Sequence, residues 1–269
     1  MHSRGIGDQL LDLLFPPRCQ VCRTFSADPL CQTCRDDLLF INAPLCPCCG
    51  ALLRMTSEPV PGELCGDCRD GRVLSGARSA GLHTGTLRDA IIAYKFGART
   101  RLAETFAAML ADVVVREIDP RSGPGLPLDL CRALVPVPLH PSRRRWRGFD
   151  QAELLCEELS SALSMPAWPD VIIRVRDTRP QTQLKGASRR SNVQGAFRAP
   201  RPWRLKGRSF ILVDDVFTTG ATLDECARVL KRAGAAGVYA LSVSRATPPW
   251  YFDELSGSGA QPTGGERGT

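Results

Sequence analysis

Two adjacent carboxylates, Asp214 and Asp215, stand between an apolar run and a segment rich in Thr and Gly. Residues 211–225 read ILVDDVFTTGATLDE, which predicts a strand, a tight loop and a helix that begins near Thr222. Such a loop directs backbone N–H groups and the positive end of a helix dipole at one point, so its expected ligand is an anion. Because the two acids would repel a bare phosphate, we expect them to accept hydrogen bonds from sugar hydroxyls or to hold a divalent cation.

The loop differs from the common phosphate-binding motifs. It lacks the lysine of GxxxxGK[ST] and the glycine spacing of GxGxxG. The order V-D-D-x-x-T-T-G-x-T instead resembles the phosphoribosyl pyrophosphate (PRPP) loop of type I phosphoribosyltransferases. That resemblance implies that the acids take the ribose 2′ and 3′ hydroxyls and that the Thr/Gly segment wraps the 5′-phosphate. The alternative is a buried strand that ends in an ordinary acidic turn.

Four CxxC pairs form a second group of chemically active residues, and nine of the 12 cysteines lie between Cys19 and Cys68. Two CxxC turns supply the four thiolates of a tetrahedral zinc site, and such a fully ligated site is structural. Pairing in sequence order predicts two sites, which would supply much of the folding energy of so small a module. An interleaved pairing, or Cys48 in place of a neighbour, stays open. The expected ligands are Cys19, Cys22, Cys31 and Cys34 for one zinc and Cys46, Cys49, Cys65 and Cys68 for the other.

The composition is that of a globular protein with a basic surface. The chain of 269 residues is 43% apolar and has 35 basic and 28 acidic residues, for a net charge of +7. No run approaches the ~20 apolar residues that span a bilayer, and no signal-peptide pattern is present, so we expect a cytoplasmic protein. The positive charge is compatible with polyanionic substrates or with nucleic acid.

Alternating strand and helix patterns must position these groups. Strands are predicted at 77–82, 132–139, 171–175, 209–214 and 237–244, and helices at 86–94, 102–117, 152–163 and 222–233. This order predicts an α/β fold with an open, mostly parallel sheet flanked by helices. The expected divisions are a double zinc ribbon at 1–72, an α/β domain at 73–246 and a disordered tail at 247–269. A short amphipathic run in 1–15 either packs against the ribbon or touches a partner.

Three basic stretches are candidates for anion contacts. Lys95 and Arg99 form the first, with surface lysine as the alternative. Residues 140–151, HPSRRRWRGFDQ, are expected to form an Arg-dense loop at a strand's carboxyl end, where open α/β sheets bind ligands, or else a solvated charge run. Gly148 would let the backbone approach a phosphate closely. The long polar stretch 176–201 is expected to be a mobile lid or a disordered insert.

Several segments together resemble the ComF family, which occurs in bacterial DNA-uptake systems and widely elsewhere. They are the CxxC pairs, YKFG, VPVPLHPSRRRWRGFDQAELL, TRPQTQLKGASRRSNVQGAF and VDDVFTTGAT. The resemblance covers nearly the whole chain and implies a type I phosphoribosyltransferase-like domain behind a double zinc ribbon. The family usually has Asn at position 150, so Asp150 would add a negative charge near the pyrophosphate site.

The resemblance also implies roles for individual residues. The acid pair would hold the PRPP ribose, directly or through Mg²⁺ and its waters, and the polar stretch with Arg190 would close over the reacting centre. Some superfamily members have a carboxylate base at the position of Thr218, where threonine cannot serve. The residues given catalytic roles are Asp214, Asp215, Arg147, Lys185 and Arg189, and those given binding roles are Asp214, Asp215, Thr218, Thr219, Gly220, Ala221, Thr222, Arg147 and Gly148.

Two functions follow from this interpretation. The first is a Mg²⁺-dependent phosphoribosyltransferase, which would expel pyrophosphate through an oxocarbenium-like state and must stabilise the departing charge and exclude water. The second is a non-catalytic sensor of PRPP or nucleotide, or an adaptor that binds single-stranded DNA or DNA-uptake proteins. The ribbon lacks a dense basic face with interleaved aromatics, so we expect it to act as a scaffold rather than a DNA reader.

Overall fold

The computed structural model describes residues 16–42, 44–54, 62–119, 121, 125–178, 191–248 and 250–252. The predictions for 1–15, for Lys185, Arg189 and Arg190, and for most of the tail lie outside these ranges. The expected domain divisions stay predictions. Across the described ranges, every helix is too short or too polar to cross a bilayer.

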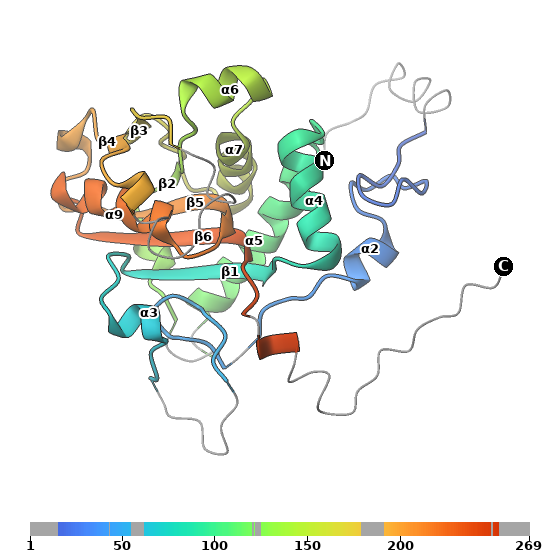
Figure 1. Cartoon of the computed structure of the whole chain (residues 1–269), viewed down its shortest axis with the longest axis horizontal. Helices are drawn as coiled ribbons and strands as arrows, with labels where there is room; N and C mark the ends of the chain where they lie inside the picture. The colour runs from blue at the N-terminus through green and yellow to red at the C-terminus, as the bar shows by residue number, and fades with distance from the viewer. Residues whose placement is uncertain are drawn as a thin grey trace.

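A parallel four-stranded sheet forms the centre of the molecule (Figure 1). Its strands are β1 (Gly76–Leu82), β6 (Gly237–Arg245), β5 (Ser209–Phe217) and β2 (Ala133–Pro136), in that order. The predicted open parallel sheet is therefore confirmed. Its strands are buried because helices cover both faces, as is usual for parallel sheets.

Alternate residues of the central strand β5 enter different cores. Ile211 and Val213 pack in a core with α4 (Gly85–Phe96), α5 (Leu102–Ile118) and α7 (Gln151–Leu163). Phe210 and Leu212 pack on the opposite face with α9 (Ala221–Arg232). Since side chains alternate along a strand, this one apolar run fixes both layers. The four predicted helices are confirmed to within two residues at each end.

Two sequence predictions about local structure are wrong. The expected Arg-dense loop at 140–151 contains a helix, α6 (Pro141–Arg147), because Pro141 occupies its first turn, His140 caps it and Gly148 ends it in a left-handed conformation. The predicted strand at 171–175 shrinks to β3 (Ile173–Arg174), which pairs antiparallel with β4 (Phe197–Arg198) outside the main sheet. β3 cannot join that sheet because residues 166–168 already pair with β2.

Other chain segments cover both edges of the sheet. Along β1, the N–H of Leu82 donates to Leu39 and the N–H of Ile41 donates to Ala80, at 2.8 and 3.1 Å. At the other edge, the N–H of Leu134 donates to Pro166 at 2.9 Å and that of Trp168 donates to Leu134 at 2.8 Å. Backbone groups on the outer strands thus find partners within the chain.

The two halves of the cysteine-rich segment lie on different parts of this sheet domain (Figure 1). The first half contains α2 (Gln32–Asp36), and its Cys19, Leu30 and Cys34 belong to the same core as α4 and α5. The second half contains α3 (Gly66–Arg69) and meets β1, where the N–H of Ala77 donates to the carbonyl of Cys48 at 2.8 Å. Two short 3-10 helices lie at Leu128–Leu130 and Pro202–Arg204.

Candidate functional site

A cavity of about 280 Å³ opens at the carboxyl ends of β2 and β5, where open parallel sheets bind ligands. A wider groove of about 700 Å³ lies at the opposite end of the sheet, around Cys131 and Ser209, but the described residues that line it include no acid pair. The cavity at the carboxyl ends is therefore the candidate functional site. Its charged walls are Lys95, Arg143, Arg147, Arg174, Asp214 and Asp215.

The acid pair is strongly affected by its surroundings. Asp215 is 3% exposed, and its Oδ1 lies 2.6 Å from Nζ of Lys95, while its Oδ2 has no hydrogen-bond partner among the described residues. Asp214 is partly exposed to the cavity and accepts from the N–H of Asp215 at 2.9 Å. Burial, and then the charge of Asp215, raises the pKa of Asp214 to about 8. Both effects would be relieved by a bound cation or by hydroxyl donors.

Two arginines face the acids with incomplete hydrogen bonding. Arg147, the last residue of α6, donates to Oε1 of Gln151 and lies with its Cζ 5.1 Å from the centre of the Phe96 ring. Burial lowers the pKa of Arg147 and of Arg174. Both Nε atoms are buried and have no hydrogen-bond partner in the part of the chain that the structure describes. Because buried polar groups normally find partners, these donors and Oδ2 of Asp215 fit a highly polar ligand.

The loop after β5, residues 218–222, is here called the anion loop. Gly220 has φ of 77° and is the N-cap of α9, and it provides no side-chain cap. The first N–H groups of α9 therefore keep capacity to bind an anion at the positive end of the helix dipole. Thr218 and Thr222 line the cavity, and the Oγ1 of Thr219 accepts from the N–H of Ala221 at 3.4 Å.

The structure brings together only part of the predicted site. Thr219, Gly220, Ala221 and Gly148 are not among the lining residues, while Lys185 and Arg189 lie outside the described ranges. The predicted residues that share the cavity are Asp214, Asp215, Arg147, Thr218, Thr222 and Lys95.

Sequence reasoning missed three polar residues of the cavity, namely His83, Gln151 and Arg174. Burial, and then Lys95, lowers the pKa of His83, so its ring is neutral at pH 7. The position of His83 directly after a strand was the available signal. Arg174 gave none, because it lies on β3 outside the main sheet.

Asp150 does not line the cavity and is instead a buried structural cap. Its carboxylate accepts from the N–H groups of Ala152 at 3.0 Å and Glu153 at 3.3 Å at the start of α7, and from Leu139 at 3.0 Å. Burial raises the pKa of Asp150, although these three donors oppose the change. The negative charge of Asp150, which we expected beside a pyrophosphate site, therefore contacts backbone N–H groups instead.

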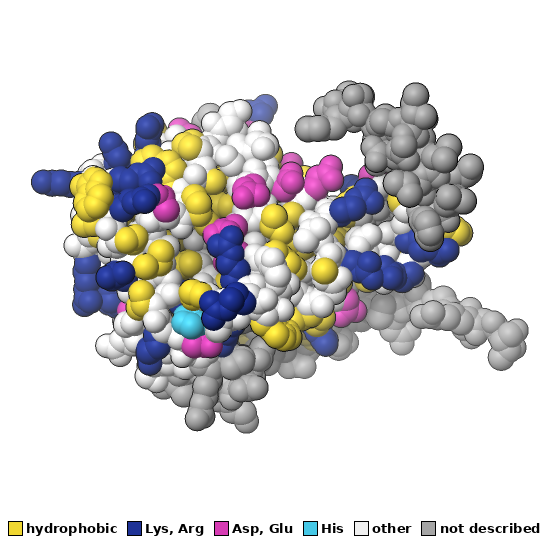
Figure 2. All heavy atoms as spheres, turned by 90° about the horizontal axis from the view of Figure 1, so that it is seen from above, with side chains coloured by type: hydrophobic (Ala, Val, Ile, Leu, Met, Phe, Trp, Pro, Cys, Tyr) yellow, Lys and Arg dark blue, Asp and Glu magenta, His cyan; other side chains and the backbone are white. Residues whose placement is uncertain are grey.

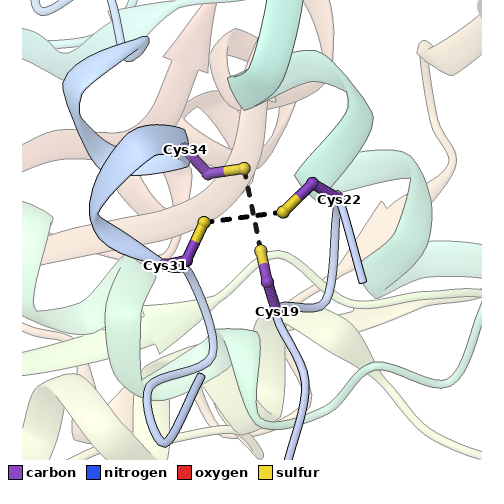
Figure 3. A group of neighbouring side chains, drawn as sticks. All are labelled: Cys19, Cys22, Cys31 and Cys34. Carbon is purple, nitrogen blue, oxygen red and sulfur yellow. Dashed lines mark hydrogen bonds between the residues drawn. The ribbon is translucent and has the colours of Figure 1, made fainter. Parts of the chain in front are cut away.

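The eight predicted cysteine ligands form two clusters in sequence order, and within each the sulfurs lie within 4.8 Å of one another. Figure 3 shows Cys19, Cys22, Cys31 and Cys34 converging on one point. The Sγ atoms of Cys19 and Cys34 are 3.7 Å apart, and those of Cys49 and Cys65 are 3.5 Å apart. Tetrahedral ligands at ~2.3 Å from zinc stand ~3.8 Å apart, so both clusters fit Zn²⁺. Cys48 lies outside both clusters.

Comparison with known proteins agrees with this architecture. A double zinc ribbon domain matches residues 10–69. The DNA utilization protein YhgH of Salmonella typhi is 35% identical over 231 residues, which cover 84% of this chain and 96% of that protein. The chain belongs to the ComF/YhgH family. Within this family, competence protein F of Haemophilus influenzae is 30% identical over 85% of this chain and 97% of that protein. Competence protein ComFC of Bacillus subtilis is 27% identical over 78% and 80%.

Solved structures resemble part of this ComF/YhgH family member at low sequence identity. Hypoxanthine phosphoribosyltransferase from Trypanosoma cruzi, complexed with IMP, covers 54% of this chain and 64% of its own at 15% identity and a TM-score of 0.34. The glutamine PRPP amidotransferase of Bacillus subtilis covers 56% and 30% at 17% identity and a TM-score of 0.35.

Proposed function

We propose that this ComF/YhgH family protein binds PRPP with Mg²⁺ and transfers the phosphoribosyl group to an acceptor. The observation that carries the proposal is the composition of one cavity, in which an acid pair, several cations and the N-terminal end of α9 meet. A phosphorylated sugar diphosphate needs all three: acceptors for hydroxyls or a cation, donors for a departing diphosphate, and amides for a terminal phosphate.

Each wall of the cavity supports one part of that ligand. Asp214 and Asp215 would hold the ribose hydroxyls or the Mg²⁺ ion, which neutralises diphosphate charge when bound. Arg147 and Arg174 would face the pyrophosphate. The bond between the anomeric carbon and pyrophosphate breaks, and a bond to the acceptor forms as the acceptor loses a proton. Thr218 cannot take that proton, so the acceptor must be a nucleophile that needs no strong base there.

The test is binding of PRPP with Mg²⁺ by calorimetry, combined with pyrophosphate release across candidate acceptors. Asp214→Asn with Asp215→Asn should abolish both signals, because the double variant keeps the shape of the cavity and loses its charge. Asp89→Asn, on the exposed side of α4, is the matched control and should behave like wild type. Unchanged binding and release in the double variant would remove the proposal. If the wild type binds PRPP but releases no pyrophosphate with any acceptor, the protein would be a PRPP sensor and not a transferase.

A second candidate function is single-stranded DNA binding, supported by a surface of arginines and tryptophans distant from the cavity. The guanidinium carbons of Arg132, Arg204 and Arg208 lie 5.8, 4.3 and 5.8 Å from the Trp168 ring centre. Trp203 beside them is 71% exposed. Figure 2 shows basic and hydrophobic side chains gathered at the end of the molecule where β4 and α9 lie. Bases stack on such aromatics while arginines contact phosphates.

A titration with fluorescent oligo-dT at several salt concentrations tests this second function. Binding should weaken steeply with salt if phosphate contacts dominate. Trp203→Ala should weaken it about five- to 100-fold, as expected for loss of one stacked base. Phe25→Ala, a 62% exposed aromatic on the ribbon, is the control. Should Phe25→Ala weaken binding instead, the ribbon would be the DNA-binding surface.

A further inference from the structure

Two buried arginines connect the second cysteine cluster to the anion loop. Phe217, the last residue of β5, is 1% exposed and directly precedes the loop. The guanidinium carbons of Arg72 and Arg245 lie 5.2 and 4.2 Å from the centre of its ring. Cations over an aromatic ring are attracted by its face, so both arginines help to hold the residue on which the loop begins.

Arg72 contacts both structures at once. Its side chain is 3% exposed, and Nη1 donates to Oδ2 of Asp224 on α9 at 2.9 Å. Nη2 donates to the carbonyl of Thr219 in the loop at 3.3 Å and lies 3.5 Å from Asp67 on α3. Arg72 thus joins α3, the helix that carries Cys68, to the anion loop and α9.

Arg245 makes the second connection from the end of β6. It is 7% exposed, and Nη1 donates to the carbonyl of Cys49 at 2.8 Å while Nη2 lies 3.4 Å from the Sγ of Cys49. Donors to a ligand sulfur are the outer contacts that orient metal ligands. Its neighbour Ala246 donates its N–H to the carbonyl of Phe217 at 2.9 Å.

Gly220 shows how tightly the anion loop packs against Arg72 and Phe217. A Cβ atom added there would lie 2.1 Å from Nη1 of Arg72 and 2.6 Å from Cζ of Phe217. The loop backbone therefore rests directly on the arginine. The first cluster is placed differently, because its buried cysteines pack among α4 and α5 on the other core.

We propose that Arg72 is a positioning residue that couples zinc in the second cluster to the anion loop. Zinc gathers the sulfurs and α3 around Arg72, which then fixes the Thr219 carbonyl, Gly220 and the start of α9. Coupling of this kind is reciprocal, so an anion bound to the loop must raise zinc affinity at Cys46, Cys49, Cys65 and Cys68. The identity of the anion rests on the proposed function, whereas the link between cluster and loop does not.

The experiment measures zinc affinity by equilibrium competition with a chelator, with and without ribose 5-phosphate. Mass spectrometry of alkylated cysteines assigns each zinc to its cluster. In the wild type, ribose 5-phosphate should raise the affinity of the second cluster about fivefold or more and leave the first unchanged. Arg72→Lys should keep two zincs and lose this effect, since a lysine cannot reach three partners in fixed geometry. The affinity of the Arg72→Lys variant for ribose 5-phosphate should fall by the factor that is lost from zinc affinity, about fivefold or more.

Two further variants complete the design. Arg35→Gln removes an arginine of α2 whose contacts are Leu30 and Asp28, and it should keep the full effect. Asp67→Asn removes the charge of a half-exposed partner of Arg72. It replaces Arg72→Lys in the experiment if that variant does not fold, and it should reduce the coupling between zinc and ribose 5-phosphate. Coupling that survives in Arg72→Lys and Asp67→Asn would overturn the inference.

A second measurement separates this inference from the proposed function. The proposed function fails if the wild type does not bind PRPP with Mg²⁺; if it does not bind ribose 5-phosphate, the link is tested by amide hydrogen exchange alone. Removal of zinc from the second cluster should then speed exchange at 217–222, and removal from the first should not do so selectively. Equal exchange at 217–222 with and without the second zinc would overturn the inference.

Discussion

Burial and a neighbouring carboxylate disfavour the charged form of Asp214. The carboxylate of Asp215 is buried against Lys95, and one of its oxygens has no partner within the described ranges; burial raises the pKa of Asp214 to about 8. A buried, crowded carboxylate pair costs folding free energy in the absence of a cation. Residues that reduce stability in this way are frequent at binding sites.

Asp214→Asn should therefore stabilise the ligand-free protein. Asp214 retains its proton in the folded state up to about pH 8 but loses it near pH 4 when unfolded, so its contribution to stability falls as pH rises between these values. Asn has no such penalty. The melting temperature at pH 7.5 should rise by about 2–4 °C per kcal/mol gained, with little gain at pH 4. A lower melting temperature at pH 7.5 would contradict this reasoning.

Lys95→Met should have the opposite effect, because it leaves Asp215 buried without its 2.6 Å partner. The loss of one member of a buried pair costs about 3 kcal/mol in urea unfolding. Adding Asp215→Asn should recover most of that loss, since no uncompensated charge is then buried. Arg88→Met, on the exposed side of α4, is the control. Equal stability of the single and double variants would show that Lys95 does not compensate Asp215.

At the level of elements, periodic segments were predictable and locally paired ones were not. The apolar pattern of 102–117 predicted helix α5, and the apolar run at the start of β5 predicted that strand. Both were predictable because each element buries a continuous apolar face. Helix α6 was missed because its four arginines have no apolar period, although Pro141 and Gly148 mark its ends. Arg72 and Arg245 could not be placed beside Phe217, since only the assembled fold brings them there.

The turn before α9 gives a test of local crowding. Gly220→Ala adds a methyl group 2.1 Å from Arg72 at φ +77°, whereas Gly207→Ala at φ +70° meets no described atom within 4 Å. Both substitutions carry the strain of the left-handed conformation, about 1–2 kcal/mol. Gly220→Ala should cost at least about 1 kcal/mol more in thermal unfolding. If the two variants lose the same free energy of unfolding, Arg72 moves aside at no cost.

At the level of the whole molecule, the cysteine clusters are integrated with the sheet domain. Cys19 and Cys34 are completely or almost completely buried in the core shared with α4 and α5. The second cluster contacts the last strand through Arg245. Metal binding that builds part of a core contributes to the folding of everything packed on that core.

Zinc removal should consequently destabilise the chain as one unit. A strong chelator should lower the melting temperature by about 10 °C or more and preserve a single transition, because no independent core remains to melt separately. Calorimetry with and without chelator, followed by zinc restoration, is the measurement. Two well-separated transitions in the chelated protein would show that ribbon and sheet fold independently.

The covered edges of the sheet have a consequence for self-association. Segments near Leu39 and Pro166 already occupy the outward-facing backbone groups of β1 and β2. An incoming strand from a second molecule would have to displace them, so fibril-like growth by strand addition is disfavoured. Concentrated solutions of the folded protein should therefore not form cross-β aggregates until heating or zinc loss releases these segments from the edges of the sheet.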